Sequence, residues 1–323
     1  MKNIVSISLG NSSNNFDLQT PFMGKTLRVR RLGTDGSVSK AVTLLRQWEP
    51  KADALGLGVA RDSYSVAGKR YADADSIALK SAVQRVPVTT GSRLQDILQE
   101  WAVRHVQTQL PQFFNHARVL FWSGKEQYRL VLSLSEYTQN LQFADPIVQH
   151  GVPKLLHGVH ELELYTKGAG LVASYVPDIA TDNKAVRMWA DHVLQGALQD
   201  CTVLVAMPHE VDAVLPKHLA GKVVVSCGVN DERVRAWGDA GVHTIVDAAP
   251  VLQGHVLSPA TLEAMLIGAT GRHGHALRDD DYLDMLTQTG LQPRILYPNG
   301  NTRMNRFAFV IHPLSQEYFK KVK

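Results

Sequence analysis

A carboxylate lies in a small loop between a predicted strand and a predicted helix, where it could carry out acid–base chemistry. The loop reads Gly33-Thr34-Asp35-Gly36, the segment 27–32 before it favours a strand, and apolar residues recur at helical spacing from Val38 onward. A carboxylate at a strand end and near a helix N-terminus can hydrogen-bond a hydroxyl group or accept a proton. Asp35 is therefore the candidate catalytic residue, and Thr34 and Gly36 are candidate substrate contacts. The structural alternative is that Asp35 is a turn residue or a helix cap.

Two other strand-end loops could bind an anion or a polyol. One loop, residues 10–13, follows the apolar segment 4–9, and the other, residues 89–93, follows the segment 86–88 and precedes a helical pattern. Small residues let the backbone approach a ligand, hydroxyl and amide groups can bind phosphate, and a guanidinium can pair with a carboxylate or phosphate. The candidate substrate- or phosphate-binding residues are Gly10, Asn11, Ser12, Ser13, Thr90, Gly91, Ser92 and Arg93. A plain polar loop at the first site and a capped helix with an exposed arginine at the second are the structural alternatives.

A further loop, Trp122-Ser123-Gly124-Lys125, stands where a dinucleotide-binding turn would follow the first strand of a second α/β segment. The dinucleotide fingerprint needs three glycines, and this loop has only one of them. Ser123 and Gly124 are the candidate cofactor-binding residues, and NAD or NADP is the candidate cofactor. Because the fingerprint is incomplete, the alternative that no dinucleotide binds stays open.

The histidines and cysteines indicate neither a metal site nor a nucleophile. The run His157-x-x-His160-Glu161 has a spacing that a helix would place partly on one face, but no third ligand lies near it in the sequence. The pair His273-x-His275 is typical of a surface loop. Cys227 follows a predicted strand without an assignable base, so a buried thiol is the better interpretation. We therefore predict no metal.

The composition excludes several classes of partner. The chain has 323 residues, a formal net charge of +4, and basic residues that are scattered rather than gathered in a stripe, which argues against nucleic-acid binding. No apolar run approaches the ~18 residues that a membrane span needs. Two cysteines and an N-terminus that leads directly into a strand indicate a reducing, cytoplasmic location without a signal peptide. The predicted partner is a small-molecule substrate, and a homo-oligomer stays open.

Apolar strands alternate with helical patterns along most of the chain, which predicts an α/β fold with mainly parallel sheets. We expect two Rossmann-like lobes, residues 1–113 and 114–297, with a cleft between the lobes that presents the strand-end loops of both. The C-terminal helices can return onto the first lobe. Residues 298–323 form a tail, whose segment Arg306–Pro313 is either a last edge strand or the first strand of a further domain.

Several segments together resemble a group of bacterial proteins labelled quinate 5-dehydrogenase. The matching segments are 4–10, Gly33-Thr34-Asp35-Gly36, 53–58, 87–94 and 221–225, and the resemblance extends to about Tyr297. The tail segment 307–314 is similar to the opening of shikimate-dehydrogenase-like and acyl-carrier-protein reductase-like enzymes. The resemblance implies an NAD(P)-dependent oxidoreductase acting on a hydroxylated carboxylate or related carbonyl, with Asp35 as acid–base group or hydroxyl anchor.

One departure from that resemblance concerns the lysine partner of Asp35, and a second class of function stays open. Shikimate dehydrogenases pair the Asp of a Thr-Asp-Gly loop with an upstream lysine in an Asn-Val-Thr-x-Pro-x-Lys context, and nothing in this chain matches that context. The alternative is a non-catalytic substrate-binding or regulatory module of a larger fused reductase, or of one partnered with a reductase domain or subunit. The missing glycine fingerprint and the tail favour this alternative.

Overall fold

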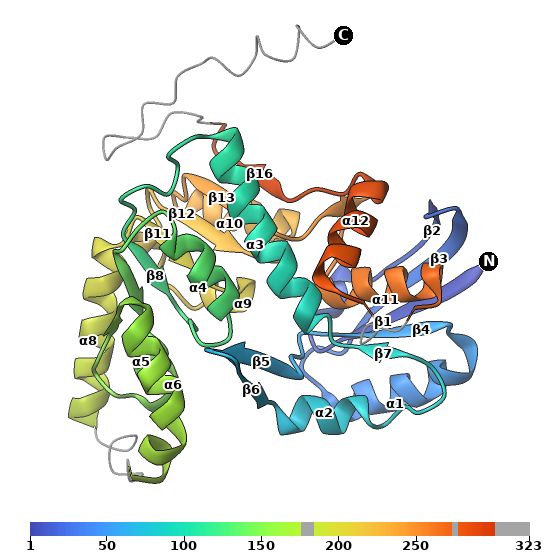
Figure 1. The fold of residues 1–323 in the computed structure, drawn as a ribbon, viewed down its shortest axis with the longest axis horizontal. Helices are drawn as coiled ribbons and strands as arrows, with labels where there is room; N and C mark the ends of the chain where they lie inside the picture. The colour runs from blue at the N-terminus through green and yellow to red at the C-terminus, as the bar shows by residue number, and fades with distance from the viewer. Residues whose placement is uncertain (176–183, 273–276, 301–323) are drawn as a thin grey trace, which may run out of the picture. The chain divides into compact units, whose positions relative to one another are not determined.

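The chain folds into two compact units. The computed structural model describes residues 1–175, 184–272 and 277–300 (Figure 1). One unit comprises Met1–Leu98 and Ala249–Gln292, and the other comprises Gln99–Ala248 and the chain from Pro293 onward. These bounds differ from the expected division at residue 113, because the chain passes from one unit to the other within helix α3 (Ser92–Gln109). The tail segment 307–314 lies outside the described residues.

The first unit is built on a five-stranded sheet with the order β2-β3-β1-β4-β7. Its strands are β1 (Lys2–Ser8), β2 (Phe16–Phe22), β3 (Lys25–Gly33), β4 (Ala54–Gly58) and β7 (Val88–Thr89). Strand β1 pairs in parallel with β3 and β4, and β7 pairs in parallel with β4, whereas β2 joins β3 as an antiparallel hairpin. All residues of β4 are buried, as expected for a central strand covered on both faces.

Helices α1 (Val38–Trp48), α2 (Ala74–Lys80), α11 (Pro259–Thr270) and α12 (Asp279–Thr289) complete the first unit. Ser37 and Asp73 cap α1 and α2 by accepting hydrogen bonds from the amides three residues onward. Helix α11 is buried almost throughout and packs against β1, β3, β4 and β7. The helix approaches so closely that a Cβ at Gly56 would lie 2.6 Å from the Ala260 carbonyl oxygen.

The described chain also contains 3-10 helices and two short β-hairpins outside the two main sheets. The 3-10 helices are η1 (Ser12–Asn14) and η2 (Glu49–Lys51) in the first unit and η3 (Pro216–His218) in the second. Strands β5 (Ser63–Val66) and β6 (Lys69–Ala72) pair only with each other among the described strands, as do β14 (Val251–Leu252) and β15 (His255–Val256). In the β5–β6 hairpin the rings of Tyr64 and Tyr71 stack with their centroids 5.3 Å apart.

The second unit is built on a seven-stranded sheet with the order β10-β9-β8-β11-β12-β13-β16. The strands are β8 (Val119–Phe121), β9 (Leu141–Phe143), β10 (Leu156–His157), β11 (Val203–Val205), β12 (Val223–Ser226), β13 (Thr244–Asp247) and β16 (Arg294–Leu296). The five central strands are parallel, and the two edge strands are antiparallel. The helices are α4 (Tyr128–Ser135), α5 (Asp145–His150), α6 (Gly158–Tyr175), α8 (Lys184–Asp200), α9 (Pro208–Val211) and α10 (Asp231–Asp239).

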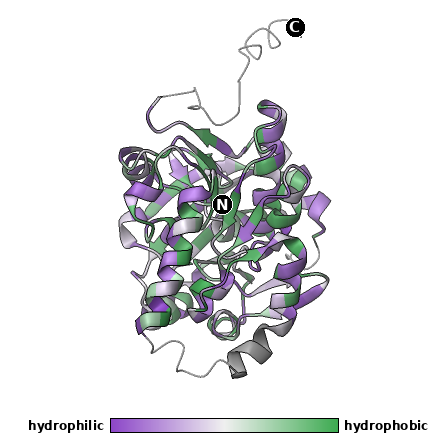
Figure 2. Cartoon of the chain, turned by 90° about the vertical axis from the view of Figure 1, so that its left-hand side faces the viewer, coloured by the Kyte–Doolittle hydropathy of each residue, from purple (hydrophilic) through white to green (hydrophobic). Residues whose placement is uncertain are grey.

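The predicted α/β class, with two units of mainly parallel sheet, is confirmed. Strand residues such as Leu120, Leu204, Val224 and Ile245 form one core cluster of the second unit. In Figure 2 the strands are largely coloured as hydrophobic, and the helices alternate between hydrophobic and hydrophilic residues. Among the described residues, no helix is both long and apolar enough to cross a membrane. The predicted cleft between the lobes stays a prediction.

Candidate functional site

The two loops predicted after the first strands lie together at the carboxyl ends of β1 and β3. Parallel pairing places Ser8 opposite Gly33, so the loops leave the sheet side by side. The Ser12 amide donates to Asp35 Oδ1 at 2.7 Å, the Asp35 amide donates to the Gly10 carbonyl at 3.2 Å, and the Gly36 amide donates to the Leu9 carbonyl at 2.7 Å. The structure thus brings Gly10, Asn11, Ser12, Ser13, Thr34, Asp35 and Gly36 into one cluster.

Hydrogen bonds inside the protein already occupy this cluster. The Ser12 amide, with help from the Lys40 ammonium at 3.8 Å, holds the pKa of Asp35 below its usual range. Asn11 caps η1 by accepting from the Ser13 amide at 2.7 Å, and Arg31 donates to the Asn11 carbonyl at 2.9 Å. An exposed carboxylate of low pKa that accepts a backbone amide is a weak base. The geometry therefore favours a structural role for Asp35, and its catalytic role stays a prediction.

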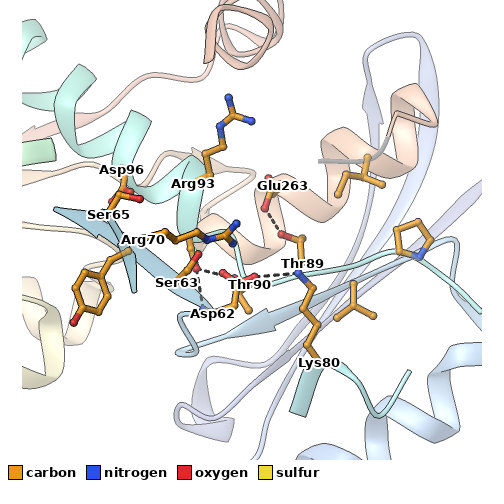
Figure 3. A pocket seen from close by; sticks show the side chains of 15 residues that line it. Asp62, Ser63, Ser65, Arg70, Lys80, Thr89, Thr90, Arg93, Asp96 and Glu263 are labelled. Atoms are coloured by element: carbon orange, nitrogen blue, oxygen red, sulfur yellow. Dashed lines mark hydrogen bonds and ion pairs between the residues drawn. The ribbon is translucent and has the colours of Figure 1, made fainter. Parts of the chain in front are cut away.

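A pocket of about 610 Å³ opens in the first unit where β7 ends and α3 begins (Figure 3). Its walls come from the segment after β4, the β5–β6 hairpin, α2, the β7–α3 loop and α11. The lining residues are mainly polar: Asp62, Ser63, Tyr64, Ser65, Arg70, Lys80, Pro87, Val88, Thr89, Thr90, Ser92, Arg93, Asp96, Glu263 and Ile267. Three of the predicted binding residues, Thr90, Ser92 and Arg93, are therefore part of a concave site.

Gly91 shapes this loop without lining the pocket. Its φ is +72°, and a Cβ there would overlap the backbone nitrogen of Ala260 at the start of α11. Only glycine combines this φ with so close an approach. The Gly91 amide donates to Thr89 Oγ1 at 3.0 Å, which fixes the turn from strand to helix.

A chain of hydroxyl groups leads from the start of α3 to a carboxylate in the pocket wall. Ser92 Oγ accepts the Asp62 amide at 3.2 Å, the Ser92 and Thr90 hydroxyls are 2.7 Å apart, and Thr90 Oγ1 donates to Asp62 Oδ1 at 3.0 Å. Lys80 Nζ lies 3.0 Å from Asp62 Oδ2. Burial acts to raise the pKa of Asp62, but the hydrogen bonds from Lys80, Ser92 and Thr90 outweigh burial and leave that pKa below its usual value. Asp62 is thus an ionised acceptor.

Arg93 does not present a free guanidinium to a ligand. Its Nε donates to Asp279 Oδ1 at 2.8 Å, its Nη1 donates to the Leu277 carbonyl, and its guanidinium carbon lies 5.7 Å from the centre of the Tyr282 ring. In Figure 3 its side chain points away from Asp62 and Thr90. The guanidinium expected to bind an anionic ligand therefore pairs with Asp279 inside the protein.

Sequence reasoning missed Glu263, the most buried charged group of the pocket wall. Its side chain lies on α11, is 5% exposed, and accepts hydrogen bonds from the hydroxyls of Thr89 and Tyr282. Burial, together with the Glu263 carboxylate, raises the pKa of Tyr282, so the phenol stays protonated and donates. One signal could have found this residue: Glu263 is the single charged residue in the apolar helix 259–270.

In the second unit, carboxylates of the chain itself bind the loop proposed for a dinucleotide. Asp145 accepts the amides of Gly124 at 2.8 Å and Lys125 at 3.0 Å, and Glu210 accepts the Ser123 hydroxyl at 2.9 Å. Burial raises the pKa of Asp145 to about 6 and also raises that of Glu210. These donors are the groups that a pyrophosphate would need. The geometry thus gives no support to a dinucleotide at Ser123 and Gly124.

The histidine run lies at the start of α6, and Cys227 is a buried thiol. Glu161 accepts the His157 amide at 2.9 Å, as a helix cap does. Within residues 1–175, 184–272 and 277–300, no three His, Cys, Asp or Glu side chains are close enough to hold a metal. Cys227 is buried and forms no disulfide. His273 and His275 lie outside the described residues.

Solved structures similar to this chain include proteins of different functions. A solute-binding protein of an ABC transporter from Agrobacterium vitis, with bound D-fucose, is 10% identical, covers 93% of this chain and 97% of its own, and has a TM-score of 0.35. The periplasmic binding protein of the arabinose transporter from Shewanella sp. ANA-3 is 10% identical, with 94% and 87% covered and a TM-score of 0.34. The NAD-dependent malic enzyme of Thermotoga maritima is 9% identical, with 90% and 84% covered and a TM-score of 0.33.

Against these comparisons, the predicted cytoplasmic location and the predicted oxidoreductase class are wrong, whereas the resemblance to quinate and shikimate dehydrogenases stays a prediction. Two of the three proteins above are sugar-binding parts of transporters, and one of these is named periplasmic. NAD or NADP as a cofactor stays a prediction. The TM-scores are too low to transfer the ligands or the cellular locations of those proteins to this chain.

Two family models cover most of the chain, and no curated protein matches it. The first, Domain of unknown function (DUF8753), matches residues 3–90. The second, Domain of unknown function (DUF8754), matches residues 93–298. The models meet at the β7–α3 loop, so the pocket draws residues from both. Because the second model matches more than half of the chain, the protein belongs to the DUF8754 family.

Proposed function

We propose that this protein is a binding module for a small polar molecule, which it holds in the pocket at the carboxyl end of β7. The observation that carries the proposal is the network of Ser92, Thr90, Asp62 and Lys80 at the wall of a pocket of about 610 Å³. In open parallel sheets, ligands bind beyond the carboxyl ends of strands, and pockets of about 300–1,000 Å³ suit small molecules.

The lining favours a ligand rich in hydrogen-bonding groups over an apolar one. The lining includes hydroxyls of serine, threonine and tyrosine together with three acidic and three basic side chains. An apolar ligand would leave several of these groups desolvated and without partners, which costs binding free energy. The second unit supports binding over hydride transfer, since carboxylates engage the loop predicted for NAD or NADP. A reductase partner and a homo-oligomer stay predictions.

Binding can be tested on the purified chain by thermal shift, followed by isothermal titration calorimetry of every hit. The probes are monosaccharides (D-fucose and L-arabinose among them), hydroxy acids, amino acids, NAD and NADP. We expect one of the small polar classes to raise the melting temperature by binding the folded chain.

Two variants show whether a bound probe occupies the pocket. Thr90→Val removes the hydroxyl that donates to Asp62 and should weaken binding roughly tenfold. Thr43→Val is the matched control, because the Thr43 hydroxyl donates to the Ser39 carbonyl of its own helix at 3.0 Å and does not line the pocket. The proposal fails if no probe binds, or if both variants bind as the parent chain does.

A further inference from the structure

The charged side chains that line the pocket do not all find partners within the protein. Asp62 pairs with Lys80 at 3.0 Å, and Arg93 pairs with Asp279 at 2.7 Å. Asp96 pairs with Arg61, which lies next to the pocket, at 2.5 Å. Two lining charges remain: among the described residues, neither Glu263 nor Arg70 makes an ion pair. One is an anion and the other a cation.

Among the described residues, no lysine, arginine or histidine forms an ion pair with the carboxylate of Glu263. The side chain is 5% exposed, and its hydrogen-bond partners are two neutral hydroxyls, those of Thr89 and Tyr282. A buried carboxylate is costly unless a cation pairs with it, and hydroxyl donors compensate only part of that cost. Glu263 lines the pocket, so a cationic group of a ligand can supply the missing charge.

Arg70 supplies the opposite charge from another wall. It lies on strand β6 of the β5–β6 hairpin and is exposed. In Figure 3 its side chain extends from the hairpin toward the side of the pocket where Thr89 and Glu263 lie. A guanidinium without a carboxylate partner is suited to bind a carboxylate through two hydrogen bonds. Its neighbour Lys69 does not line the pocket and stands over the Tyr71 ring at 5.2 Å.

We infer that the ligand is a zwitterion of the amino-acid class, whose carboxylate pairs with Arg70 and whose ammonium pairs with Glu263. This inference rests on the proposed function of the pocket. The lining holds three acidic and three basic side chains, so a ligand without net charge keeps the pocket neutral. A hydroxy acid would satisfy Arg70 but bring Glu263 only one more neutral donor. A sugar would leave both charges without a counter-ion.

The test compares each amino acid with two analogues that each lack one charge. Every protein amino acid is titrated into the full chain, and for each hit so are the 2-hydroxy acid, which lacks the ammonium, and the amino alcohol, which lacks the carboxylate. We expect at least one amino acid to bind at least about tenfold more tightly than both of its analogues.

Two pocket variants assign each charge of the ligand to its partner. Arg70→Met should weaken binding of the amino acid and the hydroxy acid at least about tenfold but leave the amino alcohol unchanged. Glu263→Gln should weaken the amino acid and the amino alcohol but leave the hydroxy acid unchanged. Lys69→Met removes the same charge from the adjacent position of β6 and should change none of the three affinities. If Glu263→Gln does not fold, Tyr282→Phe, which keeps the carboxylate, should still bind the amino acid more tightly than the hydroxy acid.

The possible outcomes separate this inference from the proposed function. If sugars or hydroxy acids bind in a Thr90-dependent way and no amino acid does, the zwitterion is overturned and the binding module stands. If an amino acid binds but Arg70→Met acts no more strongly than Lys69→Met, the zwitterion is likewise overturned. If no probe of any class binds, both proposals fail.

Discussion

The carboxylates at the strand ends of the two units have different partners, and the partners separate structural from binding roles. In the second unit Asp145 accepts the Gly124 and Lys125 amides, and Asp247 accepts the Gly228 amide at 2.7 Å and the Val229 amide at 3.1 Å. Each carboxylate thus accepts hydrogen bonds from backbone amides that would otherwise be free to bind an anionic ligand. In the first unit Asp62 instead accepts from side chains, Thr90 and Lys80, at the wall of a pocket.

The position of a carboxylate at a strand end therefore does not by itself indicate that it takes part in chemistry. Asp35 and Asp62 both follow strands of the first sheet. Their hydrogen-bond partners differ, however, because Asp35 accepts the backbone amide of Ser12, in the way that Asp145 accepts backbone amides in the second unit. A carboxylate that holds backbone amides fixes a loop, whereas one that is held by side chains facing a pocket can exchange those partners with a ligand. Substitutions of the two kinds of carboxylate should therefore differ in whether they change stability or ligand binding.

Removing Asp247 should destabilise the protein most. Its side chain is fully buried and bonds two amides and the Arg294 guanidinium, which is itself largely buried. Asp247→Ala leaves that guanidinium without its counter-charge, and we expect the free energy of unfolding to fall by about 3–5 kcal/mol in urea titration. Glu136→Ala, which breaks an exposed pair with Arg104, should lower it by about 1 kcal/mol or less. Equal losses in the two variants would contradict the structural role of Asp247.

Gly91→Ala should destabilise the first unit and weaken ligand binding together. The new methyl group overlaps the backbone of Ala260 at a residue whose φ is +72°, so the β7–α3 loop must move. We expect a loss of about 3 kcal/mol in the free energy of unfolding, measured by urea titration. Gly68→Ala is the matched control, because φ is +79° there but no atom lies within 4 Å, and its loss should be about 1 kcal/mol. If Gly91→Ala unfolds like Gly68→Ala, the close approach to α11 is wrong.

The sequence predicts much of the fold but only one wall of the pocket. Alternating strands and helices, and caps such as Asn230 before α10, depend on neighbouring residues and so can be recognised from a short window. Thr90 and Ser92 can be predicted as binding residues in the same way, because they lie in a small loop between a strand and a helix. Glu263, however, lies 174 residues from Thr89, and Asp279 lies 186 residues from Arg93. The return of residues 249–292 to the first unit agrees with the expectation for the C-terminal helices. The individual partners that this return brings together are not specified by any local pattern.

The pH dependence of stability should report the burial of Asp145. Its pKa rises from 3.8 to about 6 on folding, so the folded chain binds more protons than the unfolded chain between these values. Stability from this group is fully present below pH 3.8 and is lost as pH rises through about 6. We expect the parent chain to lose about 2–3 kcal/mol relative to Asp145→Asn across this range, in urea titrations at a series of pH values. Parallel pH profiles for the two proteins would show that Asp145 is not desolvated.

Asp35→Asn should have the smallest effect, and it separates the two kinds of carboxylate within one unit. Asparagine keeps an oxygen that can accept the Ser12 amide but loses the attraction to Lys40, an exposed pair. Because water screens such pairs, we expect the melting temperature to change by only about a degree or two, and calorimetry should show ligand affinity in the pocket unchanged. Asp62→Asn, in contrast, removes the charge that Lys80 pairs with and should weaken binding. If Asp35→Asn abolished binding while the melting temperature stayed constant, the carboxylate would contact the ligand. The distinction between carboxylates that accept backbone amides and carboxylates that accept side-chain donors would then be wrong for the first unit, which contains the pocket.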